Sequence, residues 1–285
     1  MQKKWYHVPV NIFSWDEIRS LQMISMKTDP DSFDFDKWTK CMTEVLSETP
    51  DMLLTEGDRQ GEPVLRTEIS KYLYQSRGVV CSQEQVVISA GTQQLVNRMA
   101  RLLKLMDIEH ICTEDPGYAP VKNIFRDWGF SISDIPVRDN GIEIEKLPTN
   151  IRTAAYVCPQ NQFPTGAVMP QERRQQLLDW AEANNSLLIE NDYNGDSRRS
   201  DLSVPALQGL DNGKRVVYIG TFSPTLFPAV RISYMILPGP VAKLFDSIKP
   251  DYDQTSSKTE QLTLARFMHE GWYQANLIRV RALYA

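Results

Sequence analysis

The chain has 285 residues, 42% hydrophobic and 24% charged, which is the composition of an ordinary globular protein. Its net charge of -5, without a basic run, gives no electrostatic case for direct nucleic-acid binding. No apolar segment suits a signal peptide or a membrane span, and three scattered histidines give no metal site. Widely spaced cysteines disfavour a disulfide framework and favour a cytoplasmic location; they stand at positions 41, 81, 112 and 158.

The predicted elements alternate between helix and strand. A capping-box pattern opens a short helix at 14–17, and apolar spacing predicts helices over 35–46, 61–74, 92–105 and 170–184. Apolar runs predict strands over 85–89, 110–113, 154–157, 186–189 and 215–219. Short apolar strands separated by helices predict an α/β fold, with a mostly parallel sheet sandwiched between helices. Ligands of such sheets bind at the carboxyl ends of the strands.

The first strand-end motif is Ser89-Ala90-Gly91-Thr92-Gln93-Gln94. A strand ends, a glycine allows a tight turn, and a helix begins. The free N–H groups and positive dipole end of that helix would form an anion site. The alternative is an ordinary capped turn between a strand and a helix.

Three further strand ends carry polar or aromatic residues. The turn over 114–118 is either a type II turn with a surface tyrosine, or it presents Tyr118 for stacking on a flat ligand. The segment 189–193 is either a solvated loop or a set of groups that address a heteroaromatic ring. After the last predicted strand, Thr221 and Ser223 offer hydroxyls, and Arg231 offers a planar cation for phosphate or for a surface salt bridge.

Taken in order, these motifs resemble those of one family. From about Ser25 onwards, the chain is similar to the aminotransferase-like domain of MocR-family transcriptional regulators, which has the fold-type I architecture of pyridoxal-phosphate (PLP) enzymes. The matching landmarks are 29–33 with Trp38, 57–61 with Leu65 and Arg66, 91–94, 114–118, 162–166, 192–193, 205–211 and 220–223.

The resemblance implies roles for individual residues. Tyr118 would stack on the pyridine ring of the cofactor, Tyr193 would bind its phenolic oxygen, and Asn191 would lie at its ring nitrogen. The cofactor phosphate would be held by Gly91, Thr92, Gln93, Thr221, Ser223 and Arg231. The resemblance also implies a homodimer, and an amine or amino acid as a possible small-molecule ligand.

Family members carry an N-terminal winged-helix domain and a C-terminal small domain. In this chain we expect residues 1–24 to be an arm that packs on a dimer partner or a linker remnant. Residues 25–285 are expected to form the aminotransferase-like large domain, with the small domain truncated.

Several positions depart from the family pattern. Pro224 replaces the lysine that bonds covalently to PLP, and proline has no amine. Asn191 replaces the aspartate that keeps the ring nitrogen protonated, so the electron sink is weakened. Glu56 stands where a tyrosine usually reaches the partner subunit's phosphate, and Asn161 stands where the family usually has histidine.

These departures leave three hypotheses. The first is a catalytically degenerate domain that binds PLP weakly and without a covalent bond. The second is a truncated fold remnant that binds nothing. The third is an active aminotransferase that uses another lysine; however, Lys214 is predicted at the wrong end of its strand, and Lys122 is predicted on a helix.

Overall fold

The computed structural model describes residues 32–193, 195 and 205–283. The predicted helix start at 14–17 and the expected arm at 1–24 lie outside these residues. No helix in the described part of the chain is both long and apolar enough to cross a membrane.

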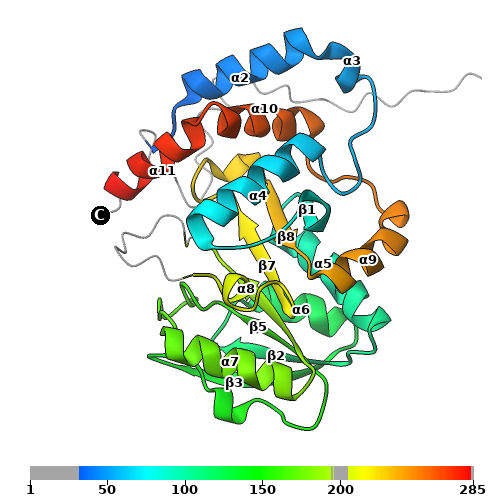
Figure 1. The fold of residues 1–285 in the computed structure, drawn as a ribbon, viewed down its shortest axis with the longest axis vertical. Coiled ribbons are helices and arrows are strands. Elements are labelled where there is room, and N and C mark those ends of the chain that lie inside the picture. The colour runs from blue at the N-terminus through cyan, green and yellow to red at the C-terminus, as the bar shows by residue number, and fades with distance from the viewer. Residues whose placement is uncertain (1–31, 194, 196–204, 284–285) are drawn as a thin grey trace, which may run out of the picture.

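An eight-stranded sheet forms the centre of the molecule (Figure 1), in the order β1-β8-β7-β6-β5-β2-β3-β4. The strands β7, β6, β5, β2 and β3 are mutually parallel neighbours, whereas β8 runs antiparallel to both β1 and β7. The mostly parallel α/β fold predicted from the sequence is therefore confirmed. The strand bounds are β1 Val86–Ser89, β2 His110–Asp115, β3 Ser131–Arg138, β4 Gly141–Ile142, β5 Ala154–Val157, β6 Leu187–Asn191, β7 Val216–Thr221 and β8 Ser233–Ile236.

The helices predicted over the described residues are present with small shifts at their ends, whereas β3, β4, β8 and the helices over 50–53, 207–210, 239–248 and 258–269 were not predicted. α4 begins with a proline in its first turn and ends at Gly78, which adopts the left-handed conformation that glycine favours. The helix bounds are α2 Phe35–Glu48, α3 Pro50–Leu53, α4 Pro63–Arg77, α5 Thr92–Leu105, α6 Ala119–Asp127, α7 Gln171–Ala183, α8 Leu207–Leu210, α9 Gly239–Ile248, α10 Lys258–His269 and α11 Trp272–Leu283.

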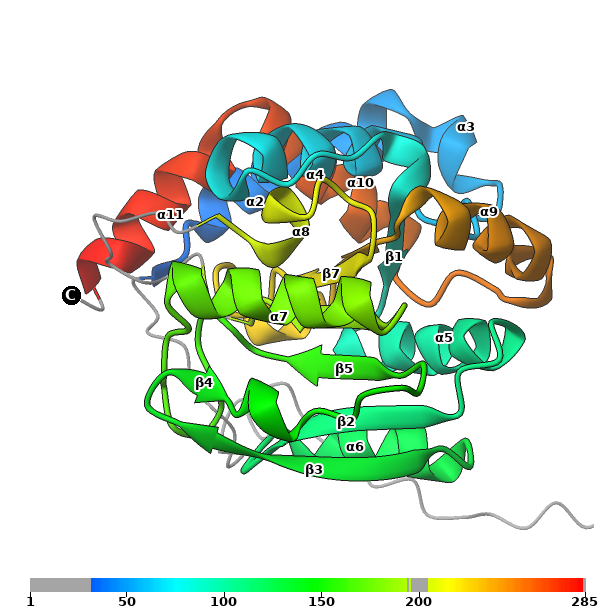
Figure 2. The same ribbon diagram turned by 60° about the horizontal axis from the view of Figure 1, so that its bottom comes forward.

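Helices cover both faces of the sheet (Figure 2). Successive side chains of β7 point to opposite faces, and both faces are apolar. Val217 and Ile219 belong to one buried cluster with α5, whereas Tyr218 belongs to another with α4. The apolar stripe of α5, which includes Val96 and Met99, packs on the first of these faces. We call it the α5 face, and it is the face on which the candidate site lies.

The reversed strand β8 determines what reaches the carboxyl edge of the sheet. Ser233, at the start of β8, pairs with Ser89 at the end of β1 and with Thr221 at the end of β7. The residues that precede β8 therefore lie at the same edge as the carboxyl ends of its neighbours. This placement brings Arg231 towards the predicted anion site.

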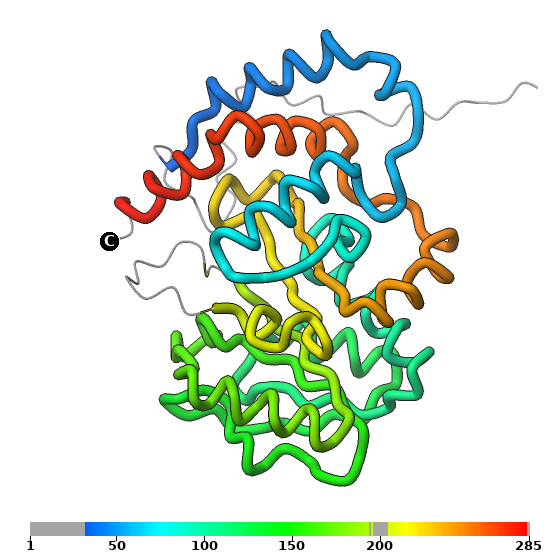
Figure 3. The backbone as a smooth tube through the Cα atoms, viewed as in Figure 1, coloured from blue at the N-terminus to red at the C-terminus, as the bar shows by residue number. Residues whose placement is uncertain are grey.

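The last helix holds the segment that follows β7. Asn276 of α11 donates from Nδ2 to the carbonyl oxygen of Thr225 at 2.6 Å, and the Tyr273 hydroxyl lies 3.1 Å from Thr225 Oγ1. The path of the backbone shows α2 lying along α10 and α11 (Figure 3), and Arg266 of α10 forms an ion pair with Glu44 of α2. α11 is thus connected to the loop that carries Pro224, and α10 is connected to α2.

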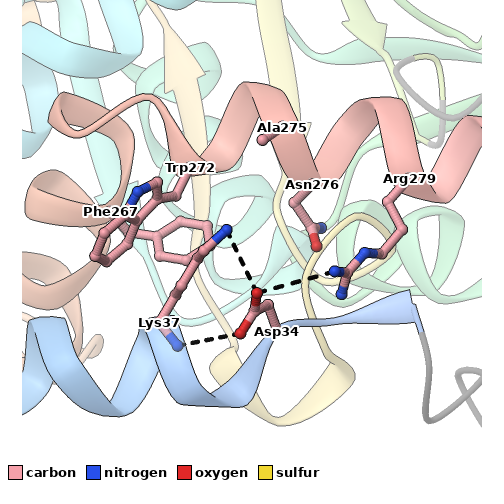
Figure 4. Close-up of a pocket in the computed structure, with 7 residues that line it drawn as sticks. All are labelled: Asp34, Lys37, Phe267, Trp272, Ala275, Asn276 and Arg279. Atoms are coloured by element: carbon pink, nitrogen blue, oxygen red, sulfur yellow. Dashed lines mark hydrogen bonds and ion pairs between the residues drawn. The ribbon is translucent and has the colours of Figure 1, made fainter.

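A small pocket lies between α2 and α11 (Figure 4). On one side of it, Asp34 pairs with Lys37 at 3.4 Å and lies 3.9 Å from Arg279. On the other side, Asn276 is buried, and its Oδ1 has no hydrogen-bond partner among the described residues. The pocket is lined by Asp34, Lys37, Phe267, Trp272, Ala275, Asn276 and Arg279.

Removal of the Asn276 side chain should destabilise the fold. The Asn276→Ala change deletes a buried hydrogen bond and leaves the Thr225 carbonyl without a donor, so we expect the free energy of unfolding to fall by about 1–3 kcal/mol. Arg279→Ala, one turn along α11, removes only a long and half-exposed ion pair and should cost less than about 1 kcal/mol. Urea unfolding of both variants measures this difference, and equal losses would contradict the role given to Asn276.

Candidate functional site

The strongest feature of the carboxyl edge is the contact between Gly91 and Arg231. Gly91 precedes α5 with φ at 93°, and a Cβ atom built there would lie 2.3 Å from Arg231 Nη2. The guanidinium group therefore packs against the start of α5, where Thr92 and Gln93 open the helix. No side chain caps this helix, and its first backbone N–H groups lack helical acceptors. A helix N-terminus with an adjacent arginine suits an anion such as phosphate.

Hydroxyl groups lie beside this helix terminus on the neighbouring strands. Ser233 Oγ donates to Thr221 Oγ1 at 2.8 Å, and the Ser223 backbone N–H approaches the same oxygen at 3.4 Å. The Ser223 hydroxyl is itself buried and has no hydrogen-bond partner among the described residues. Buried polar atoms are nearly always paired, so this hydroxyl is available to a ligand. We refer to Gly91, Thr92, Gln93, Thr221, Ser223 and Arg231 as the anion cup; these residues fit the phosphate of PLP.

Asn191 ends β6 and points to the α5 face. Strand alternation places it on the same side as Ile189, whereas Glu190 points to the opposite face. The side chain is 7% exposed, and its Nδ2 lies 3.7 Å from Cys158 Sγ. The group at this strand end is therefore a neutral amide beside a thiol.

The two carboxylates that flank Asn191 are engaged elsewhere. Glu190 accepts the backbone N–H of Leu207, at the start of α8, at 3.0 Å. Asp192 Oδ2 accepts from Arg77 Nε at 2.7 Å and from the Tyr218 hydroxyl at 2.6 Å. These interactions tie the end of β6 to buried groups of α4, α8 and β7. Neither carboxylate shares the α5 face with Asn191.

Two partly exposed tyrosines follow strands that end at this edge. Tyr118 is 38% exposed at the start of α6, and its ring lies edge-on to Phe163 with a centroid separation of 6.3 Å. Tyr193, which is 39% exposed, has a raised pKa because of burial and, to a smaller extent, the neighbouring Tyr118 phenol. Tyr118 and Tyr193 thus follow the ends of β2 and β6, at the same carboxyl edge of the sheet. The Asp115–Pro116 peptide bond before Tyr118 is cis, which is outside the type II turn suggested by the sequence.

A buried polar cluster beneath these tyrosines was missed in the sequence. Glu114 accepts the Cys158 backbone N–H at 3.0 Å and a hydrogen bond from Gln162 Nε2 at 3.1 Å. Burial raises the pKa of Glu114 to about 7 and raises those of Cys158 and Tyr156 well above their usual values. The Tyr156 hydroxyl has no hydrogen-bond partner among the described residues. Tyr156 lies one residue before the end of the apolar strand β5, and this polar group at a strand end was the signal available in the sequence.

Pro224 is half-buried in the loop after β7, two residues beyond the buried Phe222. Lys214 precedes β7 and so lies at the opposite, amino end of that strand, as predicted. Lys122 lies on α6, as predicted, where its Nζ pairs with Asp134 at 2.5 Å. Neither lysine lies at the end of β7 where Pro224 stands.

The two other departures lie in loops. Glu56 is exposed after α3, and its backbone carbonyl accepts a hydrogen bond from Lys258 Nζ at 3.1 Å. Asn161 is half-buried in the loop after β5.

The raised pKa of Glu114 predicts a pH-dependent stability. The pKa of Glu114 in the folded chain, about 7, is above its ordinary value of 4.5. The contribution of protonated Glu114 to stability is therefore full below pH 4.5 and is lost as the pH rises through 7. The Glu114→Gln side chain stays neutral at every pH. The difference in free energy of unfolding between this variant and the parent should therefore shift in favour of the variant by up to roughly 3 kcal/mol from pH 5 to pH 8.5.

Urea titrations at several pH values measure this gain. The exposed Glu172→Gln change on α7 serves as the control and should leave the parent's pH profile unaltered. Parallel pH profiles for Glu114→Gln and the parent would show that Glu114 ionises normally in the folded chain.

Comparisons with known proteins agree with this geometry. The family model "Aminotransferase class I and II" matches residues 27–267. The uncharacterized HTH-type transcriptional regulator YdeL of Bacillus subtilis is 44% identical over 256 residues, which cover 90% of this chain and 55% of the relative. The probable rhizopine catabolism regulatory protein MocR of Rhizobium meliloti is 34% identical, covering 89% of this chain and 51% of the relative.

Solved structures support the same fold. Kynurenine aminotransferase of Pyrococcus horikoshii superposes with a TM-score of 0.80 at 24% identity, covering 90% of this chain and 65% of that one. The chain spans about half the length of the curated relatives named above. It belongs to the aminotransferase class I and II family, and its aminotransferase-like domain is homologous to that of MocR-type regulators.

Proposed function

We propose that this chain is the ligand-binding, aminotransferase-like domain of a MocR-type regulator, and that it binds PLP without a covalent bond and without catalysing transamination. The observation that carries the proposal is the combination of a formed anion cup with a proline at position 224. Gly91 and Arg231 are in contact, and Ser223 has an unpaired buried hydroxyl. The phosphate-binding half of the site is therefore supported, whereas the residue that would supply the amine is absent.

Each residue has a role in this proposal. The anion cup would hold the phosphate through the first N–H groups of α5 and the Arg231 guanidinium. Tyr118 would stack on the ring and Tyr193 would bind its phenolic oxygen, which is supported by their partly exposed positions after β2 and β6. Asn191 would face the ring nitrogen. Bound PLP supplies an aldehyde that reacts with amines, and its ring withdraws electrons.

The neutral side chain of Asn191 argues against efficient catalysis. A carboxylate stabilises a protonated pyridine ring, whereas an amide provides hydrogen bonds without a charge. The carboxylates of Glu190 and Asp192 accept hydrogen bonds away from the α5 face. The site is therefore suited to binding rather than to electron withdrawal.

We also propose that the chain forms a homodimer in the cytoplasm. Large apolar side chains are exposed at the end of α2 and in α3, where Leu46, Met52 and Leu54 are 53%, 42% and 84% exposed. The four cysteines are free thiols, which is consistent with a reducing compartment. Sedimentation equilibrium should give twice the mass of the chain, and a monomer at micromolar concentration would contradict the dimer.

Titration of the purified chain with PLP tests the proposed binding. The parent should melt at a higher temperature with PLP and show no ligand attached at the 224 segment after borohydride reduction and peptide mass mapping. Pro224→Lys should gain that attachment together with a visible absorption band. Attachment in the parent at another lysine, with turnover of an amino acid and a keto acid, would instead support an active aminotransferase.

A matched pair of arginine variants tests the anion cup. Arg231→Gln should abolish most of the thermal stabilisation by PLP, because it removes the charge that faces the phosphate. Arg279→Gln, on α11 away from the cup, should leave the stabilisation unchanged. If neither the parent nor Pro224→Lys responds to PLP, the chain is a fold remnant that binds no cofactor.

A further inference from the structure

We infer that the site recognises the phosphorylated pyridine core and does not discriminate between substituents at the carbon that carries the aldehyde. Its ligand class would then be the 5'-phosphates of pyridoxal, pyridoxamine and pyridoxine alike. This inference rests on the proposed function, because it assumes non-covalent binding in the anion cup. It adds to that proposal that the site makes no use of the aldehyde group in recognising its ligand.

The first step concerns the aldehyde end of the ligand. An aldehyde is distinguished from an alcohol or an amine chiefly by its bond to a primary amine. Pro224 provides no amine, Lys214 lies at the far end of β7, and Lys122 is paired with Asp134. Lys258 donates to oxygen atoms of Thr55 and Glu56. Among the described residues, none of these three lysines lies at the end of β7, where an amine would select the aldehyde.

The second step concerns the ring nitrogen. The three ligands differ in how readily this nitrogen is protonated, so a carboxylate there would favour the most basic of them. Asn191 is the polar side chain at the end of β6 on the α5 face, and an amide can donate to a neutral nitrogen or accept from a protonated one. The Glu190 carboxylate is on the other face, bound to the start of α8. Ring charge is thus not a basis for selection.

The third step concerns what remains for recognition. Arg231, the start of α5 and the unpaired Ser223 hydroxyl address the phosphate, which all three ligands share. Tyr118 and Tyr193 address the ring face and the phenolic oxygen, which they also share. None of these groups depends on the oxidation state of the aldehyde carbon. Similar affinities for the three ligands follow.

Isothermal titration calorimetry of the whole chain tests the inference with pyridoxal, pyridoxamine and pyridoxine 5'-phosphates, and with inorganic phosphate for comparison. We expect the three dissociation constants to agree within about threefold, each at least tenfold lower than that of inorganic phosphate. A pyridoxal phosphate affinity more than tenfold above the other two would overturn the inference while leaving the proposed function intact. Failure of all three to bind more tightly than inorganic phosphate would remove the proposed function as well.

Two variants at position 224 separate the amine from the ring of proline. Pro224→Lys should tighten pyridoxal phosphate alone by at least tenfold. Pro224→Ala has neither amine nor ring and should keep the three affinities equal, so it remains informative if the lysine variant does not fold. A preference for the aldehyde that persists in Pro224→Ala would show that another group selects it and would overturn the inference.

Discussion

The candidate site depends on the direction of one strand. Because β8 runs antiparallel between β1 and β7, the residues before it lie at the edge where the parallel strands end. Arg231 is thereby placed against Gly91, at the uncapped start of α5. Gly91 has φ at 93°, which side chains other than glycine rarely tolerate, so glycine is favoured there and leaves room for the guanidinium group. The anion cup follows from this sheet topology together with a single glycine.

The two halves of the proposed site differ. The half that we propose for phosphate has its helix terminus, its arginine and a Ser223 hydroxyl with no hydrogen-bond partner among the described residues. At the other half, position 224 is a proline, which has no amine, and an amide faces the α5 side of the sheet. Asn276 and Tyr273 hold the Thr225 segment in place, so the loop keeps its position without a lysine. A stable fold and a lost reaction are therefore compatible.

The sequence predicted most of the parallel sheet because its strands are short apolar runs between amphipathic helices, and α5 was predicted with its observed bounds. Strand β8, Ser233–Ile236, was missed; it follows a loop with two prolines and is not separated from β7 by a helix of the length that marks the other parallel strands. The motif order identified the anion cup, whereas the Gly91–Arg231 contact required the three-dimensional register. The buried cluster of Glu114, Tyr156 and Cys158 was missed because pairwise contacts between separate strand ends leave no periodic signal.

The most direct measurement is a crystal structure of the chain grown with PLP. The account predicts the phosphate at the first N–H groups of α5, with Arg231 and the Ser223 hydroxyl within hydrogen-bond distance. It also predicts a ligand ring against Tyr118, with no continuous density to any lysine. A phosphate bound away from α5, or a ligand joined to a lysine side chain, would contradict the account.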